Sequence, residues 1–337
     1  MPKKLSIIIP AYNVEEYIEK CIRSLENQDM VQDDYEIIVT NDGSPDRCRE
    51  IVESLQKEFS NIVLINQENQ GVSMARNNAI AEAQGEYMLP IDPDDYVVGN
   101  VLNAVYENAK SRDLDVLYLS FEIFNAQGNS IWETDYAFKD ETVFDGVEGY
   151  FAPRGSSVKD PDRSVAMLYR LDMLRQYQIN YPKNVPFLED GLFLGKVFTV
   201  AQRVGFSSAK FYQRTTRMGS ATNSRLFYSD HAIQGFVNAI EDIKNFDVTN
   251  QFNENQKLLI NQVIAKFILL PLTSLIGKKS IKNYYNFINQ LKKKDLNNIN
   301  VEGLRFNYYK MASIYNTSSL LFYFYFQISS KLKSYTK

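Results

Sequence analysis

Residues 85–95, GEYMLPIDPDD, consist of a short apolar run that leads directly into three carboxylates. The apolar part, Tyr87–Ile91, is typical of a buried strand, and the chain turns acidic immediately after it. In α/β proteins, ligands bind in the loops beyond the carboxyl ends of the strands. The stretch therefore predicts a strand followed by a binding loop that carries Asp92, Asp94 and Asp95.

The rest of the first 120 residues alternates between strand and helix periodicities. Short apolar, often β-branched runs predict strands at residues 5–9, 35–39, 62–65, 87–91 and 115–121. Apolar residues at helical spacing predict helices between these strands, and the second helix is expected to start with Ser44 as N-cap and Pro45. Strands that alternate with helices of about 10–15 residues imply βαβ units and a mostly parallel sheet flanked by helices.

The remainder of the chain changes in both pattern and charge. Helices are expected near residues 231–246, 254–276, 280–294 and 304–333. Residues 1–250 carry 38 acidic and 24 basic side chains, whereas residues 251–337 carry 3 acidic and 13 basic ones. We therefore predict an α/β domain over residues 1–225 and an all-helical, basic domain over residues 226–337.

Composition excludes several classes of protein. One histidine and two cysteines cannot build a zinc cluster, and His231 stands beside no recognisable nucleophile motif. The N-terminus lacks the apolar stretch of a signal peptide, which together with the few cysteines favours a cytoplasmic location. The apolar stretches Phe267–Ile276 and Leu320–Ile328 are shorter than the roughly 20 residues that span a bilayer, so no spanning segment is expected.

The acidic cluster that begins at Asp92 has two interpretations. Three carboxylates within four residues repel one another unless a counter-ion lies between them. Mg²⁺ or Mn²⁺, which prefer oxygen ligands, would resolve this repulsion and bridge to substrate phosphates. The alternative is an acidic turn that caps a helix, because aspartate is favoured near helix N-termini. Spacing alone leaves both interpretations open.

Two more polar segments follow predicted strands. Asp42, in the Asn41–Ser44 segment, is able to accept hydrogen bonds from a base or ribose, or it belongs to a simple turn. Arg76 follows the Asn69–Gly71 segment and either reaches a phosphate near the helix N-terminus or is a solvated surface arginine. No GxGxxG or GxxxxGK(S/T) motif is present, which argues against a nicotinamide-binding fold or a P-loop NTPase.

In chain order, the segments Ile7–Asn13, Asn41–Ser44, Asn69–Asn77 and Gly85–Asp95 together resemble the family 2 glycosyltransferases. The resemblance is strong over residues 5–100, weaker to about residue 220, and absent beyond. It implies the GT-A (Rossmann-like) α/β fold and an inverting transfer from a nucleotide-diphosphate sugar, usually a UDP sugar, to a saccharide hydroxyl. Bacterial surface-polysaccharide synthesis is the type of pathway implied.

The resemblance also assigns the residues that bind the donor. By motif position, Ala11, Tyr12 and Asp42 would hold the base, and Arg76 would assist nucleotide binding. The implied nucleotide-sugar site comprises Pro10, Ala11, Tyr12, Asn13, Asp42, Asn69, Gly71, Arg76, Asp92 and Pro93.

Metal and base are assigned in the same way. Asp92 would contact the ribose or the water shell of a metal ion, Asp94 would ligate Mn²⁺ or Mg²⁺ directly, and Asp95 is a further acidic candidate. An inverting displacement needs a base that takes the proton of the attacking hydroxyl. Asp190 matches the base of the family's ED motif, with Glu189 as the second candidate. From the residues alone, this pair also fits a charged first turn of a helix.

The segment at residues 212–220 resembles a basic segment found in many relatives. There Arg214 or Arg217 would offset diphosphate charge as a loop closes. The segment lacks the QxxRW motif of processive synthases, which favours a single-addition enzyme.

Lysines flank the C-terminal helical stretches, and an aromatic run, Leu320–Phe326, lies between them. This part either contacts an anionic membrane surface, at the inner face of the plasma membrane, or packs against the α/β domain with its lysines solvated. The lysines are Lys278, Lys279, Lys282, Lys292, Lys293, Lys294, Lys331, Lys333 and Lys337.

The leading hypothesis is a metal-dependent inverting glycosyltransferase that uses a nucleotide-diphosphate sugar and a saccharide or lipid-linked saccharide acceptor. Nucleic acid is not expected as a partner. Two alternatives are a degenerate glycosyltransferase-like scaffold and an aspartate-based phosphotransferase. The phosphotransferase is disfavoured because its aspartates follow the first strand, whereas here they follow the fourth.

Overall fold

The computed structural model describes residues 3–125, 127–134, 136, 141–155, 162–215, 225–277 and 280–335. The chain forms two compact units: residues 1–183 with 200–220, and residues 184–199 with 221–337. The prediction from sequence was a single boundary near residue 225. In the structure, residues 184–199 instead belong to the same compact unit as residues 221–337.

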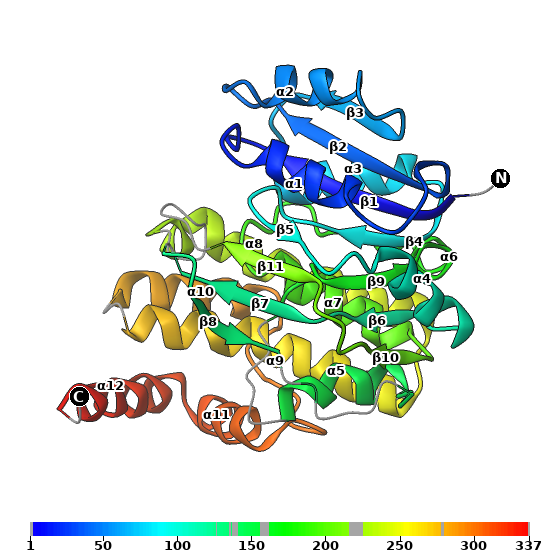
Figure 1. Ribbon diagram of the computed structural model, residues 1–337. Helices are drawn as coiled ribbons and strands as arrows, with labels where there is room; N and C mark the ends of the chain where they lie inside the picture. Colours follow the sequence, from blue (N-terminus) through cyan, green and yellow to red (C-terminus); the bar gives the residue numbers. More distant parts are fainter. Residues whose placement is uncertain are drawn as a thin grey trace. The chain divides into compact units, whose positions relative to one another are not determined.

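The first unit has the alternating order of strands and helices that the sequence predicts over its first 111 residues (Figure 1). Its elements are β1 (Lys3–Ala11), α1 (Ile18–Glu26), β2 (Tyr35–Asp42), α2 (Cys48–Leu55), β3 (Ile62–Gln67), α3 (Val72–Glu82), β4 (Gly85–Pro90), β5 (Tyr96–Val97), α4 (Leu102–Ser111), β6 (Val116–Tyr118), β7 (Phe121–Phe124), β8 (Ser130–Glu133), α5 (Gly146–Gly155), β9 (Met167–Arg170), α6 (Leu171–Gln176), β10 (Val204–Phe206) and β11 (Tyr212–Thr215).

Within the described ranges, a seven-stranded sheet has the order β10-β6-β9-β4-β1-β2-β3. Only β9 runs antiparallel to its neighbours β4 and β6, and the remaining pairs are parallel. The mostly parallel sheet flanked by helices is therefore confirmed. Because the strands are parallel, the loops that follow β1, β2, β3 and β4 all leave from the same carboxyl edge.

The central strand β1 shows why this sequence folds as a sheet covered on both faces. Ile7 and Ile9 are fully buried in a core cluster with Cys21 and Ile22 of α1. Ile8, which points to the other face by strand alternation, is equally buried, and α3 packs against β1 and β2. Burying each such side chain contributes about 1.5–3 kcal/mol.

Two predicted boundaries are wrong near the carboxyl edge. Strand β1 does not stop before Pro10, because its pairing with β4 ends at Ile8 and Pro10 pairs only with Thr40 of β2, so a missing N–H is tolerated there. Helix α2 starts at Cys48 rather than at Ser44, and it is Asp46 whose carboxylate accepts the Cys48 N–H at 3.1 Å.

The strand predicted at residues 115–121 is two strands in different sheets. β6 pairs with β9 and β10 in the main sheet, whereas β7 belongs to a smaller sheet of order β5-β11-β7-β8. The run is interrupted at Leu119, whose N–H bonds to the carbonyl of Ala166. Apolar residues lie on both sides of this interruption, so the sequence pattern does not reveal it.

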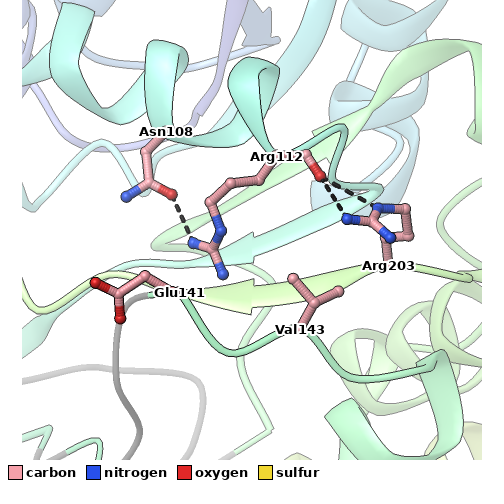
Figure 2. A pocket seen from close by; sticks show the side chains of 5 residues that line it. All are labelled: Asn108, Arg112, Glu141, Val143 and Arg203. Atoms are coloured by element: carbon pink, nitrogen blue, oxygen red, sulfur yellow. Dashed lines mark hydrogen bonds between the residues drawn. The ribbon is translucent and has the colours of Figure 1, made fainter.

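A hollow of about 380 Å³ lies at the opposite edge of the main sheet, where the chain enters β6 and β10 (Figure 2). Arg203 donates from Nε and Nη2 to the carbonyl of Arg112 at 3.2 and 3.0 Å, and Arg112 donates to Asn108 at 2.7 Å. These arginines close the end of α4 and belong to the architecture of that edge.

The second unit is helical, as predicted. Its helices are α7 (Glu189–Val200, whose last residue counts with the first unit), α8 (Asp230–Asn250), α9 (Glu254–Gly277), α10 (Ile281–Lys293), α11 (Phe306–Thr317) and α12 (Ser319–Tyr335). The single helix expected at residues 304–333 is two helices, because Ser318 adopts an extended conformation between them.

Helix α9 is longer than the apolar stretch seen in the sequence. Among the described residues, it is the one helix long and apolar enough to cross a membrane, with a mean hydropathy of 1.8 over its best window. The apolar segment is therefore longer than the stretch Phe267–Ile276 indicated in the sequence. However, 67% of that window is buried, and α9 packs against α8, α10, α11 and α12. A core helix of a globular unit has the same properties.

Candidate functional site

The loops after β1 and β2 meet at the carboxyl edge of the main sheet. Ala11 is buried at the end of β1, and Tyr12 follows it with 48% of its surface exposed. Asn13 adopts a positive φ and donates its backbone N–H to Ser44 Oγ at 2.7 Å. An exposed aromatic ring is thus held beside a fixed loop, which is suited to stacking against a planar base.

Asp42 organises the loop between β3 and α3. Its buried carboxylate accepts hydrogen bonds from Gln67 Nε2 at 2.7 Å and from the backbone N–H groups of Gln70 and Gly71 at 2.8 and 2.9 Å. Gly71 has φ +86°, a conformation that favours glycine, and it begins α3 as N-cap. Asp42 therefore shapes the segment that contains the exposed Asn69.

Gly43 allows the loops after β2 and β3 to touch. Its φ is +64°, and a Cβ built there would lie 2.9 Å from the backbone nitrogen of Asn69. Any side chain would push the two loops apart. The sequence motif around Asp42 thus has a structural cause beyond the predicted helix cap.

Arg76 on α3 reaches the acidic loop instead of solvent. Its guanidinium is 5% exposed, donates to Asp92 Oδ1 at 2.8 Å, and lies over the ring of Tyr181 with its Cζ 4.9 Å from the centroid. A surface arginine is therefore excluded. Arg76 fixes the carboxylate of Asp92. Replacing either residue would leave the other without its opposite charge.

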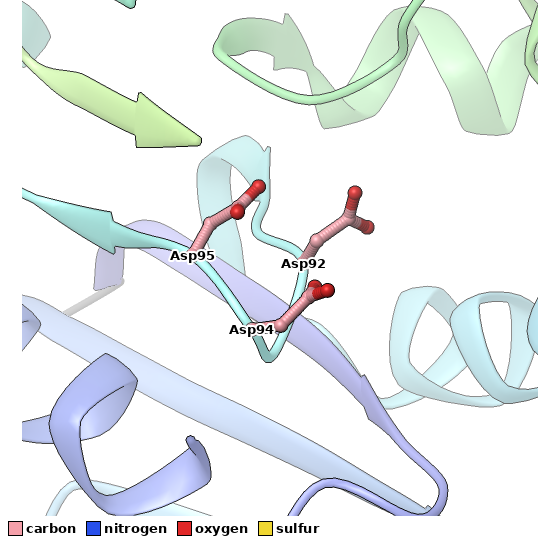
Figure 3. A group of neighbouring side chains, drawn as sticks. All are labelled: Asp92, Asp94 and Asp95. Atoms are coloured by element: carbon pink, nitrogen blue, oxygen red, sulfur yellow. The ribbon is translucent and has the colours of Figure 1, made fainter. Parts of the chain in front are cut away.

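The three aspartates of the DPDD loop converge (Figure 3). One carboxylate oxygen from each of Asp92, Asp94 and Asp95 lies within 4.8 Å of the others. Asp92 and Asp94 are half-buried, whereas Asp95 is 3% exposed. Pro93 is buried between them and rigidifies the turn. Such a set of oxygens fits the preference of Mg²⁺ and Mn²⁺.

Asp95 is tied to β11 across the small sheet. Tyr212 Oη donates to Asp95 Oδ2 at 2.8 Å and accepts the backbone N–H of Asp92 at 3.1 Å. The backbone N–H of Thr215 donates to Asp95 Oδ1 at 2.9 Å. Burial, followed by the charges of Asp92 and Asp94, raises the pKa of Asp95 to about 8. Asp95 therefore anchors the loop, while Asp94 is the more accessible oxygen donor.

Glu189 and Asp190 form the first turn of α7, as predicted, and they belong to the second unit. Leu188, just before them, has φ +64°, which is uncommon for a branched side chain. Its carbonyl accepts the N–H groups of Gly191 and Leu192 and so begins the helix. Both carboxylates are half-buried at the helix N-terminus, where negative charge is stabilised.

Arg214 lies half-buried on β11, paired in register with Ile123 of β7. Arg217 lies outside the described residues, as do Lys278, Lys279 and Lys337. The structural roles of Tyr212, Thr215 and Gln67 were not predicted from the sequence. No local pattern marks a tyrosine that bonds a residue 117 positions away.

The mostly parallel sheet, the acidic loop at its carboxyl edge and the following helices define the class: a GT-A-like α/β protein with a helical second unit. Residues 6–165 match the model of the family described as Glycosyl transferase family 2. This part of the chain is therefore a family 2 glycosyltransferase domain, and the resemblance seen in the motifs is confirmed.

Among curated proteins, the chain is 26% identical over 268 residues to the poly(ribitol-phosphate) beta-glucosyltransferase of Bacillus spizizenii; the match covers 77% of this chain and 39% of that protein. The chain thus spans about two fifths of this relative's length. The structure resembles the crystal structure of Staphylococcus aureus TarS 1-349 in complex with UDP-GlcNAc, with a TM-score of 0.74 and 21% identity over 98% of this chain and 92% of that one.

A mannosyltransferase of Pyrobaculum calidifontis, solved in complex with GDP-Man and Mn²⁺, has a TM-score of 0.54 and 14% identity, covering 99% of this chain and 88% of that chain. At such identities, these solved structures establish the GT-A-like fold of the chain and nothing finer.

Proposed function

We propose that the protein is a metal-dependent inverting glycosyltransferase that moves a sugar from a UDP sugar to a saccharide of a cell-surface polysaccharide. The observation that carries the proposal is the DPDD loop, in which one carboxylate oxygen from each of Asp92, Asp94 and Asp95 lies within 4.8 Å of the others, while Arg76 fixes Asp92 and Tyr212 fixes Asp95. The family 2 domain and the UDP-GlcNAc complex of TarS support the choice of donor.

The donor set fits a divalent cation. Three carboxylates that converge within 4.8 Å are mutually repulsive, and a cation with oxygen ligands would favour their ionised forms. Asp94 would hold Mn²⁺ or Mg²⁺, with Asp92 beside it. When bound, the ion would supply electrostatic stabilisation of the charge on the leaving diphosphate. The Mn²⁺ complex of the Pyrobaculum mannosyltransferase supports this class of ion.

The chain's own residues have separable tasks in this proposal. Tyr12 stacks on the base, and the loop shaped by Asp42, with Asn69 and Gly71, positions the nucleoside. Asp190 accepts the proton of the attacking acceptor hydroxyl, and Glu189 is the second candidate for that role. The inverting outcome follows from a single displacement with this base and no covalent intermediate on the protein.

The acceptor is proposed from the relatives. A beta-glucosyltransferase named for poly(ribitol-phosphate) supports a repeating, surface-exposed polymer as the acceptor class. Because the chain spans about two fifths of that relative, the acceptor site itself is proposed only as a saccharide hydroxyl, free or lipid-linked.

Thermal unfolding of the full chain tests donor and metal together. A UDP sugar is expected to raise the Tm by a few degrees only when Mn²⁺ or Mg²⁺ is present, since a ligand at 100 times its Kd stabilises by about 2.7 kcal/mol. Asp94→Asn should lose this metal-dependent shift. The matched control is Asp172→Asn on α6, whose side chain is 89% exposed, and it should keep the shift.

Two outcomes of this experiment would contradict the proposal. If no UDP, GDP or dTDP sugar produces a metal-dependent rise in Tm, a degenerate scaffold is the better description. If Asp94→Asn keeps the full shift, the metal is held elsewhere. Transfer of radiolabelled sugar to saccharide acceptors then separates donor hydrolysis from true transfer.

A further inference from the structure

Over residues 319–328, helix α12 carries apolar side chains on both of its faces. Phe322 and Tyr323 are buried, and their rings pack edge-on against Tyr315 of α11 and Tyr284 of α10 at centroid distances of 5.7 and 5.2 Å. This face attaches α12 to the second unit. A helix with only this role would carry polar residues on its other side.

The other side of α12 is instead an apolar stripe. At about 100° per residue, its members fall within an arc of roughly 140°. They are Leu320, Leu321, Phe324, Tyr325 and Ile328, which are between 41% and 59% exposed. A continuous stripe of this kind costs solubility unless a partner covers it.

Helix α11 extends the same exposed surface (orange beside red in Figure 1). Phe306 is 78% exposed, Tyr309 is 49% exposed, and Lys310 lies on the same side of the helix. Lys310 Nζ is 5.6 Å from the ring centroid of Tyr325, so the two helix faces adjoin. Of the sixteen large hydrophobic side chains exposed in the described part of the chain, seven are on these two helices.

The charge of the C-terminal part of the sequence, together with Lys310 beside the stripe, indicates the partner. Residues 251–337 carry 13 basic and 3 acidic side chains, and the last turns of α12 contain Lys331 and Lys333. A second copy that docked through the same two helices would bring the same positive charge and be repelled. An anionic bilayer offers the opposite charge together with an interfacial region that accepts aromatic and aliphatic side chains.

We propose that α11 and α12 dock on the surface of an anionic lipid bilayer, with the apolar stripe inserted at the level of the headgroups. The protein then acts as a peripheral membrane protein at the inner face of the plasma membrane. This inference goes beyond the proposed transfer reaction and does not depend on it, because lipid binding is measured without donor or acceptor.

Vesicle co-sedimentation of the full chain tests the proposal. Wild type is expected to partition at least tenfold more strongly to vesicles with about 30% phosphatidylglycerol than to pure phosphatidylcholine, since each basic residue near the surface adds about fivefold. Raising the salt concentration should weaken binding. The triple variant Leu321→Ser, Phe324→Ser, Ile328→Ser should lose at least tenfold in partitioning to the anionic vesicles.

A matched triple variant controls for general surface hydrophobicity. Val31, Ile131 and Val248 are 65%, 59% and 78% exposed and lie outside α11 and α12, so their replacement by serine should leave partitioning unchanged. Circular dichroism and Tm of both triple variants show whether they are folded. Wild type that stays in the supernatant, or a stripe variant that binds as wild type does, overturns the proposal. A dimer that the stripe variant abolishes, without vesicle binding, would overturn it in favour of self-association.

Discussion

The two compact units differ in where their charged and apolar side chains lie. In the first unit, charged groups at the carboxyl edge are bonded, and three of them are buried: Arg76 bonds the half-buried Asp92, Tyr212 bonds Asp95, and Asp42 bonds the backbone of Gly71. In the second, apolar groups of α12 are exposed. A bonded polar loop keeps one geometry and suits a small charged ligand, whereas an exposed apolar stripe suits an extended surface.

Asp190 gives the strongest test of this difference, because the proposed base is the one chemical role assigned to a residue of the second unit. Asp190→Asn should lower the turnover number by about 10²–10⁴-fold, the usual contribution of a general base. Nucleotide affinity should stay nearly unchanged, as measured by titration calorimetry with the UDP sugar. Glu189→Gln is the matched control and should retain most turnover. If the two variants behave in the reverse way, Glu189 is the base.

The two faces of α12 provide a second test, by stability. Phe322 is fully buried and packs on Tyr315, whereas Phe324 is 50% exposed on the same helix. Phe322→Ala should lower the free energy of unfolding by about 3–5 kcal/mol. Phe324→Ala should change it by less than about 0.5 kcal/mol. Urea unfolding of both variants measures the difference, and equal losses would show that the stripe is also packed.

Tyr212 tests whether the bonded loop of the first unit matters for function. Tyr212→Phe removes the donor to Asp95 and the acceptor of the Asp92 N–H, at a cost of about 1–3 kcal/mol. The metal concentration needed for half-maximal activity should rise several-fold. Tyr87→Phe is the control: it removes an equally buried hydroxyl that bonds the carbonyl of Leu114, so it should affect stability alone. Identical metal titrations for both variants would contradict the anchoring role.

Asp46 gives the smallest effect, confined to the stability of the first unit. Burial acts to raise the pKa of Asp46, but hydrogen bonds from Ser44, Cys48 and Glu15 outweigh it and lower the pKa to about 2. Asp46→Ala should lose about 1 kcal/mol at neutral pH. Because the folded pKa is depressed, this contribution is complete above pH of about 4 and disappears as pH falls through about 2. If the free energies of unfolding of Asp46→Ala and wild type differ by the same amount from pH 7 to pH 2, the predicted contribution of the ionised Asp46 is wrong.

The fold could be predicted where local patterns carry it. β-branched runs and helical spacing identified the strands and helices around residues 5–111, and the motif order identified the family. Prediction failed where the decisive contact is distant. The run at residues 115–121 divides because its halves pair in different sheets, and the carboxylate of Asp46, just before α2, accepts the backbone N–H of Glu15, 31 positions away. The positions of Asp92 and Asp94 were predictable, but the burial of Asp95 and Arg76 depends on Tyr212 and Asp92.

The bond between Tyr212 and Asp95 also has a consequence for the order of folding. It joins residues 117 positions apart, and the bond from Thr215 spans 120. The β-strands up to β4 can pair as soon as the first ninety residues have left the ribosome, because their contacts are closer in sequence. The acidic loop has its Arg76–Asp92 bond early, but it acquires the two bonds to Asp95 only when β11 has been synthesised and has closed this long loop. A nascent chain therefore carries an acidic loop without the bonds to Asp95 until roughly two thirds of the sequence exists.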